Sequence, residues 1–168
     1  RLTDLRIAIP DTLVANPEFK KITSFAKNHT GIRINLVSSD IQANLLRAGN
    51  DVAVRMGTMS DSDLKMKQIS QDRRVVIASP DYIALKEIPQ SPNDLKSWEF
   101  ISFSAVPDGL HLRQGNKKPV PVWGKTVALA DSVNAVRGLA CAGIGVATLP
   151  YFGVKRDLDD GKLKEVLP

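Results

Sequence analysis

Short apolar segments alternate with helix-forming segments in the first half of the chain, and this alternation limits the possible folds. Strand-like runs occupy residues 5–9, 32–36 and 51–54, and cap-forming residues follow the first two. Each connection has room for one helix. Consecutive strands that are joined in this way form a parallel sheet with right-handed crossovers. The chain is therefore predicted to have an α/β fold.

Two helices are predicted between these strands. The first follows Pro17, which suits a first helical turn, and it stops at Gly31. Its apolar residues recur at helical spacing: Phe19, Ile22, Phe25 and Ala26. The second is expected to begin after the capping residues Ser38, Ser39 and Asp40. Its apolar face would carry Ile41, Leu45 and Leu46.

The second half of the chain restarts the pattern. Strands are predicted at residues 74–78, 100–103, 144–149 and 163–167, and residues 120–130 are expected to be extended. Helices are expected after Ser79 and Ser91, which both precede a proline, and at residues 133–141, whereas residues 107–118 look like a loop. Two successive parallel α/β halves predict two lobes, residues 1–74 and 75–168.

Composition narrows the class of protein. A chain of 168 residues with 43% hydrophobic content can bury its own core without a disulfide or a metal. Its single cysteine fits a reducing cytoplasm, and no apolar run approaches the roughly 20 residues that span a bilayer. The net charge of +5 comes from scattered basic residues with few aromatics among them. This pattern favours a solvated surface over a nucleic-acid track.

The candidate ligand-binding residues follow the predicted strands. Ligands of open parallel sheets collect at the carboxyl ends of the strands, where loops and helix N-termini meet. Hydroxyl groups and helix-start N–H groups at these ends would suit a small anion such as a carboxylate. The predicted site residues are Pro10, Asp11, Thr12, Ser38, Ser39, Arg55, Ser102, Phe103, Asp131 and Ser132.

Several of these residues have a plainer interpretation as well. Arg55 could clamp a carboxylate with two hydrogen bonds, or it could pair with Asp61 or Asp63 nearby in the sequence. The hydroxyl residues and Asp131 could be simple helix caps, although a capping residue can also contact a ligand. Phe103 is expected to form a wall of the site or part of the core.

Catalytic and metal chemistry find little support in the sequence. Cys141 lies on an apolar helix without a nearby histidine, which favours a buried structural thiol over a nucleophile. The glycines at 143 and 145 end a helix and open a strand, whereas a dinucleotide-binding motif follows a strand and opens a helix. His29 and His111 lie in unrelated segments without other ligand-like residues. No cofactor, metal or catalytic constellation is predicted.

Three sequence segments resemble those of a known protein family. They are DVAVRMG at residues 51–57, RRVVIASP at 73–80 with Tyr82 after it, and LACAGIGVATLP at 139–150. Their order and spacing resemble the regulatory domain of LysR-type bacterial transcriptional regulators over nearly the whole chain. Each segment alone is weak evidence for the family, but the three in this order and spacing are specific to it.

The resemblance implies a two-lobed fold like that of type II periplasmic binding proteins, with crossing strands between the lobes and a small-molecule effector held in the cleft between them. It also implies a cytoplasmic homodimer or tetramer, in which a helix and strand of lobe one pack against a lobe-two helix of the neighbour. Family members carry a winged helix-turn-helix upstream, which would make the DNA contacts, and a returning strand and closing helix beyond Pro168. Neither segment is in this sequence.

Two other classes share this type of fold. A periplasmic solute-binding protein of a transporter would fold similarly, so the fold alone does not separate it from a regulator. Its greater usual length and the LysR-like segments favour the regulator. An enzyme on the same fold is disfavoured because no catalytic constellation is evident.

Overall fold

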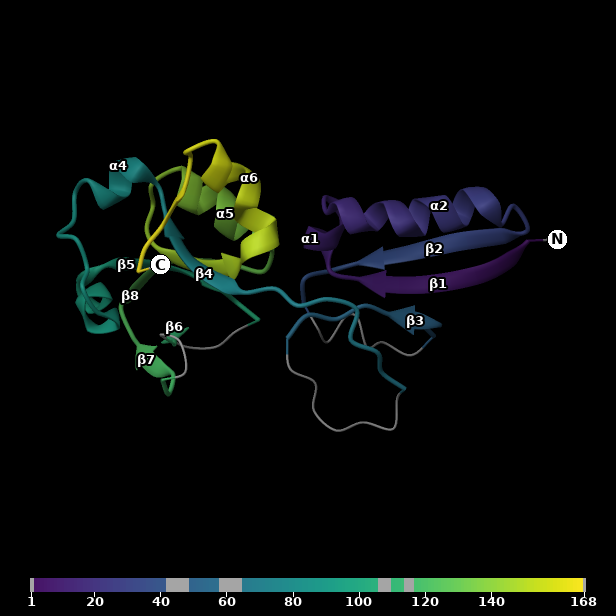
Figure 1. The fold of residues 1–168 in the computed structure, drawn as a ribbon, viewed down its shortest axis with the longest axis horizontal. Helices are drawn as coiled ribbons and strands as arrows, with labels where there is room; N and C mark the ends of the chain where they lie inside the picture. Colours follow the sequence, from purple (N-terminus) through teal and green to yellow (C-terminus); the bar gives the residue numbers. More distant parts are fainter. Residues whose placement is uncertain (1, 42–48, 58–64, 106–109, 114–116, 168) are drawn as a thin grey trace. The chain divides into compact units, whose positions relative to one another are not determined.

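The computed structural model describes residues 2–41, 49–57, 65–105, 110–113 and 117–167, and it divides into two compact units. Unit 1 is Arg1–Asp72 and unit 2 is Arg73–Pro168 (Figure 1). The predicted helix with Leu45 and Leu46 lies outside the described residues, as do Asp61 and Asp63. Within the described part of the chain, no helix is long and apolar enough to cross a membrane.

Unit 1 contains a parallel sheet in the order β2-β1-β3. The strands are β1 (Thr3–Ile9), β2 (Ile32–Ser38) and β3 (Val52–Ala53). β1 pairs with β2 along its whole length, up to Ile9 beside Ser38, and Ala8 pairs with Ala53 of β3. The parallel pairing that the sequence predicted for this half is confirmed. The third strand is shorter than predicted.

Helical segments connect β1 to β2. They are α1 (Asp11–Val14), η1 (Pro17–Phe19) and α2 (Lys20–Asn28), which lies alongside β2 (Figure 1). The side chain of Asn16 accepts a hydrogen bond from Glu18 N at 2.9 Å, and Pro17 opens the first turn as predicted. Among the described residues of unit 1, the buried ones gather at the carboxyl end of β1 and the start of α1: Ile7, Ala8, Ile9, Pro10 and Thr12.

The strand pairing of unit 2 is mixed, which corrects the prediction of a second parallel half. β4 (Arg74–Ala78) pairs antiparallel with both β9 (Ala147–Pro150) and β10 (Lys164–Glu165). β5 (Glu99–Phe103) pairs parallel with β8 (Lys125–Ala130), and Phe100 forms a parallel bridge to Val146. β4 is therefore antiparallel to both of its partners, whereas β5 and β8 are parallel to each other. Hydrophobic periodicity identifies a strand but does not give its direction, which depends on the partners it finds.

The helices of unit 2 are α4 (Pro80–Ile83), η2 (Pro92–Ser97), α5 (Val133–Cys141) and α6 (Tyr151–Asp159). Ser79 caps α4 through its side chain, which accepts from Tyr82 N at 3.2 Å, and α5 has the predicted bounds. α6 was missed, because Pro150 was interpreted only as the end of a strand. Val154 and Leu158, four residues apart, were the available signal of a helix.

A small hairpin also differs from the prediction. β6 (Leu110–Leu112) pairs antiparallel with β7 (Val120–Val122), so part of the predicted loop at residues 107–118 is a strand. The side chains of β6 are only half-buried or exposed, and its polar neighbours in the sequence mask the period-two signal.

The core of unit 2 lies on both faces of its sheet. β4 divides its side chains between two hydrophobic clusters, with Val75 and Ile77 in one and Val76 and Ala78 in the other, as strand geometry requires. The first cluster also contains residues of α5 and α6: Val133, Val136, Ala140 and Val154. The second cluster contains Tyr82, Leu95 and Trp98.

Gly145 has a packing role at the strand junction. A Cβ atom on this residue would lie 2.5 Å from the carbonyl oxygen of Glu99. Only glycine allows this close approach without a shift of backbone. Gly143 ends α5 with a φ of +79°, a conformation that favours glycine. Both glycines are thus accounted for by backbone geometry.

Candidate functional site

The carboxyl ends of the three strands of unit 1 meet at one edge of its sheet. Ser39 N donates to Ile9 O at 3.0 Å, and Val54 N donates to Ala8 O at 2.8 Å. The residues at and just after the carboxyl ends of β1, β2 and β3 are therefore brought together by the parallel register. They include six predicted site residues: Pro10, Asp11, Thr12, Ser38, Ser39 and Arg55.

Asp40 holds the start of α1 at this edge. Thr12 is buried, and its hydroxyl donates to Asp40 Oδ1 at 2.7 Å. Thr12 N donates to the same oxygen at 3.1 Å. Asp40 was predicted only as a cap for the helix after it, and its contact with α1, the helix before β2, was missed. Its place at a strand end, directly after two serines, was the signal available.

Other polar groups of this edge are also engaged. Ser39 Oγ accepts from Ile41 N at 3.1 Å, and Leu13 N donates to Pro10 O at 3.0 Å. Arg55 is half-buried just beyond β3. The backbone N–H groups at the start of α1 were predicted to bind an anion. At Thr12 and Leu13, these groups instead donate hydrogen bonds to acceptors within the protein.

Unit 2 brings its four predicted residues to the carboxyl ends of β5 and β8. Phe103 pairs with Ala130, and Ser104 N donates to Ala130 O at 2.8 Å. Asp131 and Ser132 follow directly. Ser132 Oγ accepts from Ala135 N at 3.4 Å, so the predicted capping of α5 is confirmed.

Ser102 and Phe103 present their side chains to different faces of the sheet. Phe103 packs against the hydrophobic cluster that contains α5, whereas Ser102 Oγ lies 3.4 Å from Thr126 Oγ1. Successive residues of a strand alternate in this way. One face of this edge therefore offers a hydroxyl pair and the other an aromatic ring.

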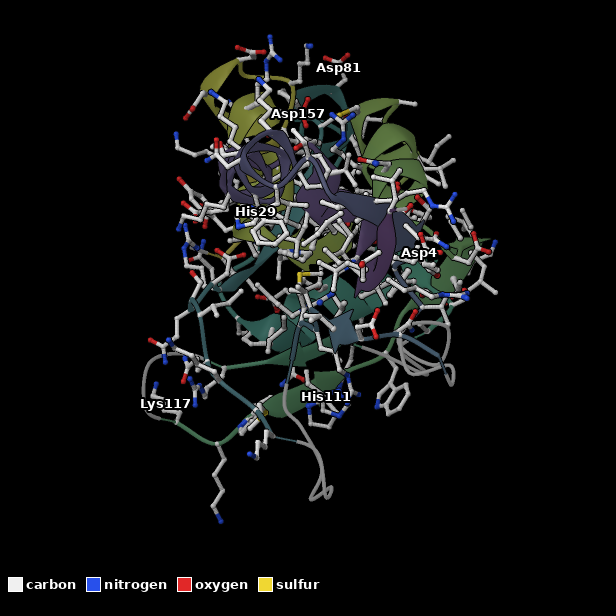
Figure 2. The ribbon with its side chains drawn as sticks, turned by 90° about the vertical axis from the view of Figure 1, so that its right-hand side faces the viewer. Asp4, His29, Asp81, His111, Lys117 and Asp157 are labelled. Carbon is white, nitrogen blue, oxygen red and sulfur yellow. The ribbon has the colours of Figure 1, made fainter. Side chains whose placement is uncertain are left out.

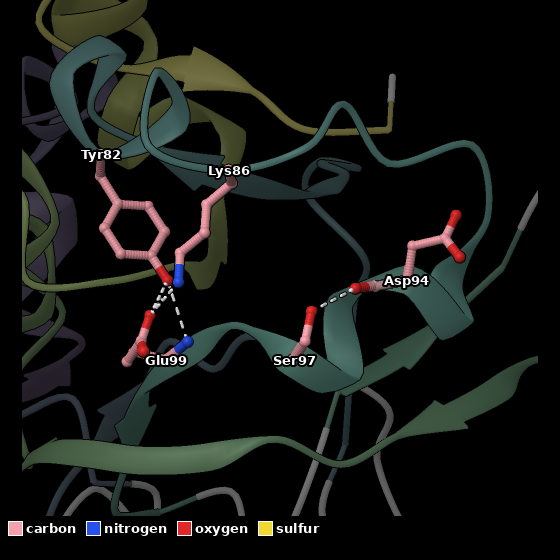
Figure 3. A network of polar contacts seen from close by, with 5 residues as sticks. All are labelled: Tyr82, Lys86, Asp94, Ser97 and Glu99. Carbon is pink, nitrogen blue, oxygen red and sulfur yellow. Dashed lines mark hydrogen bonds and ion pairs between the residues drawn. The ribbon is translucent and has the colours of Figure 1, made fainter.

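A polar network of unit 2 lies away from these strand ends (Figure 3). The Tyr82 hydroxyl and Lys86 Nζ both donate to Glu99 Oε2, the latter at 2.6 Å, and Glu99 N donates to the Tyr82 oxygen at 2.9 Å. The donors Lys86 and Tyr82 lower the pKa of Glu99 to about 2. Glu99 begins β5, so the network joins α4 to the end of the strand opposite the predicted site. Sequence reasoning gave no sign of it.

Cys141 has the properties of a structural thiol. It packs against the first hydrophobic cluster, and burial, followed by the nearby Asp157 carboxylate, raises its pKa. Arg137 Nη1 donates to that carboxylate at 2.7 Å. A raised thiol pKa leaves little thiolate at neutral pH, which is the opposite of an activated nucleophile.

The histidines have separate surroundings. His29 follows α2 and stacks on Phe25 with ring centroids 4.1 Å apart, and its Nδ1 lies 2.9 Å from Phe25 O (Figure 2). His111 lies in β6 of the other unit. Among the described residues, no group of three His, Cys, Asp or Glu side chains could hold a metal ion.

Comparison with known proteins places this geometry in a family. The family model described as the LysR substrate binding domain matches residues 3–168. The chain is a LysR substrate binding domain. This membership favours a regulator over a transport receptor.

Relatives of this LysR domain are transcriptional regulators by name. HTH-type transcriptional regulator CrgA of Neisseria meningitidis serogroup C is 34% identical over 150 residues, which are 86% of this chain and 48% of CrgA. HTH-type transcriptional activator AaeR of Escherichia coli K12 is 30% identical over 167 residues, 98% of this chain and 53% of AaeR. The chain thus spans about half the length of the curated relatives it matches.

Solved structures share the fold. The CrgA regulatory domain from Neisseria meningitidis superposes with a TM-score of 0.80 at 27% identity, over 99% of this chain and 82% of that domain. The regulatory domain of AphB from Vibrio vulnificus gives a TM-score of 0.83 at 23% identity, over 98% and 83% of the two chains. The second likeness concerns the fold alone.

Proposed function

We propose that this LysR domain senses a small-molecule effector on behalf of a bacterial transcriptional regulator that works in the cytoplasm. The observation that carries the proposal is the convergence of parallel strand ends at one edge of unit 1, within a chain of the LysR substrate binding family. Ligands of open parallel sheets bind at such edges. DNA binding is assigned to a helix-turn-helix region of the whole protein, as the names of its relatives suggest.

The effector contacts proposed in unit 1 are Ser38, Ser39, Arg55 and the backbone at residues 10–12. In unit 2 they are Ser102, Phe103, Asp131 and Ser132. An effector contact is proposed at each set within its own unit. Such a ligand would alter regulation only if it bound one arrangement of the protein more tightly than another.

A bulky substitution tests the unit 1 edge. A panel of small acids, amides and aromatic compounds is first screened by thermal shift against the 168-residue chain. Ser39→Trp should abolish the stabilisation by any hit, because the indole would fill the space beside the strand ends. Ser97→Trp, a serine-to-tryptophan change at an exposed position of η2, should leave the stabilisation intact.

Folding is checked by circular dichroism, and Thr12 is avoided because it is buried. Stabilisation that survives tryptophan at Ser38, Ser39 and Ser102 alike would show that the effector binds elsewhere.

Self-association is the second part of the proposal. Within the described residues β2 and β8 each pair on one side only, and an open strand edge is normally covered. α2 has no buried residue, and Leu129 of β8 is 66% exposed. We propose that these surfaces form a homodimer or tetramer.

Light scattering at high micromolar concentration tests this assignment. The chain should be larger than a monomer, and Leu129→Lys should shift it toward monomer. Leu85→Lys, at a residue that is 81% exposed outside these elements, is the control. A purely monomeric chain would contradict the assignment.

A further inference from the structure

Two adjacent arginines at the start of β4 have different surroundings. Arg73 is paired with Glu165, to which its guanidinium donates two hydrogen bonds at 2.6 and 2.9 Å. Within the part of the chain that the structure describes, Arg74 makes no ion pair, and its guanidinium forms one hydrogen bond, from Nη2 to the carbonyl oxygen of Thr148 at 2.7 Å. Arg74 therefore carries a positive charge that no carboxylate of the described residues offsets.

The Arg74 side chain is accessible, and its charge has a cost. Arg74 is exposed, so a ligand can reach it. The protein around the guanidinium nevertheless removes enough water from it for burial to lower its pKa. A charge that is partly removed from water and unpaired is unfavourable, and an anion bound beside it would offset that cost. A guanidinium has five N–H donors in a planar fork that fits the two oxygens of a carboxylate.

Arg74 lies on the face of the sheet that carries the second hydrophobic cluster. Side chains of a strand alternate between faces, so Arg74 is on the same side as Val76, which belongs to that cluster. Thr148 pairs with Val76 across the two strands and shares this face. Its Oγ1 is buried and makes no hydrogen bond within the described residues. The protein thus leaves the polar groups at this position incompletely satisfied.

Ser102 lies on the same face of the neighbouring strand. Phe100 of β5 belongs to the second hydrophobic cluster and forms a parallel bridge to Val146. Two residues further along both strands, Ser102 is level with Thr148, whose carbonyl oxygen accepts from Arg74. The Ser102 hydroxyl has one long contact, at 3.4 Å to a neighbouring hydroxyl, and is able to donate elsewhere. A guanidinium and a hydroxyl are thus on one face at the carboxyl end of β5.

We propose that Arg74 is the anion-binding residue of unit 2, which forms an ion pair with a carboxylate of the effector while the Ser102 hydroxyl donates a hydrogen bond to the same group. Such a carboxylate offsets the unpaired charge and accepts from the N–H groups that Arg74 does not use for Thr148. This inference rests on the proposed effector contacts in unit 2. It names the class of ligand they take, a small carboxylic acid in its ionised form.

Matched pairs of probes test this class of ligand. Benzoate and benzamide, and phenylacetate and phenylacetamide, share a ring and differ in charge. Each is titrated at pH 7 into the ¹⁵N-labelled 168-residue chain while the Ser102 and Thr148 amide signals are followed by NMR. The acids should give saturable shifts at these residues. They should bind at least about tenfold more tightly than the amides, because only the acids pair with the guanidinium.

Two variants of Arg74 test its role. Arg74→Gln keeps a donor for the Thr148 carbonyl and removes the charge, so it should weaken binding of the acids by about tenfold and change binding of the amides by less than about threefold. Arg74→Lys keeps the charge but loses the planar fork, and it should weaken the acids by about threefold without affecting the amides.

Arg156→Gln is the matched control. It removes the same charge from unit 2 at an exposed position of α6, a helix that packs on the other face of the sheet through Val154. This variant should leave the preference for acids unchanged. The NMR spectrum of each variant shows whether it is folded, and Arg74→Lys decides if Arg74→Gln is not.

The outcomes separate the two ideas. If a probe or a hit of the thermal-shift screen shifts the Ser102 signal but acids have no advantage over amides, the role of Arg74 is refuted while the effector contacts in unit 2 stand. The same holds if the folded Arg74 variants keep the full preference, or if Arg156→Gln removes it equally. If neither probes nor hits shift the Ser102 or Thr148 signals, both ideas are refuted.

Discussion

Glu99 provides a test of the link between the polar network of unit 2 and stability. Its carboxylate accepts hydrogen bonds from Lys86 and Tyr82, which lower its pKa from 4.5 to about 2. The informative perturbation is Glu99→Gln combined with a change of pH. Glutamine keeps an oxygen acceptor for both donors but removes the charge that the folded state stabilises.

The stability that this charge contributes has an upper limit set by the pKa. A fall of the pKa from 4.5 to about 2 corresponds to at most about 3.4 kcal/mol of stability above the unfolded pKa. The Glu99 side chain is 37% exposed, so solvent screens the network, and we expect about 1–1.5 kcal/mol. Because the folded pKa is the lower one, this contribution is present above about pH 5 and is lost as the pH falls from 4.5 toward 2.

The free energy of unfolding of the original chain and of the Glu99→Gln variant is measured by urea unfolding at several pH values. Tryptophan fluorescence is the probe, since Trp98 is buried near this network. The stability difference between the two proteins should be about 1–1.5 kcal/mol at pH 7 and should shrink at pH 3. Glu18→Gln, in an exposed pair with Lys21 at the start of α2, is the control and should show no such trend. A difference for Glu99→Gln that stays constant between pH 7 and pH 3 would refute the reasoning.

Two further predictions concern Cys141 and Gly145. Because burial and Asp157 raise its pKa, the Cys141 thiol should react with iodoacetamide with a pH midpoint above the ordinary 9.0, and a midpoint at or below 9.0 would contradict this assignment. Gly145→Ala should lower stability by about 2 kcal/mol in chemical denaturation, because the methyl group meets the Glu99 carbonyl at 2.5 Å. Gly138→Ala, in α5 with open space around its Cβ position, should be neutral or slightly stabilising, and equal effects of the two changes would refute the packing argument.

The candidate site was partly predictable. Placing binding residues after the strands used only the rule that parallel strands end at a common edge, and the register of Ile9 beside Ser38 bears out that geometry for unit 1. The occupation of that edge by Asp40 was not predictable. Thr12 and Asp40 are 28 residues apart, and their contact depends on the exact pairing of β1 with β2.

The sequence by itself determined the type and order of most elements. Helix caps act on neighbouring backbone groups, so the local sequence is enough to predict them. Examples are Ser79 with Pro80 before α4, Ser132 before α5 and Gly143 after α5. The tertiary structure alone decided that β4 runs against its partners and that Tyr82 meets Glu99, 17 residues away. Strand direction and long-range polar contacts depend on which surfaces pack together, and local hydrophobic periodicity carries no information about that choice.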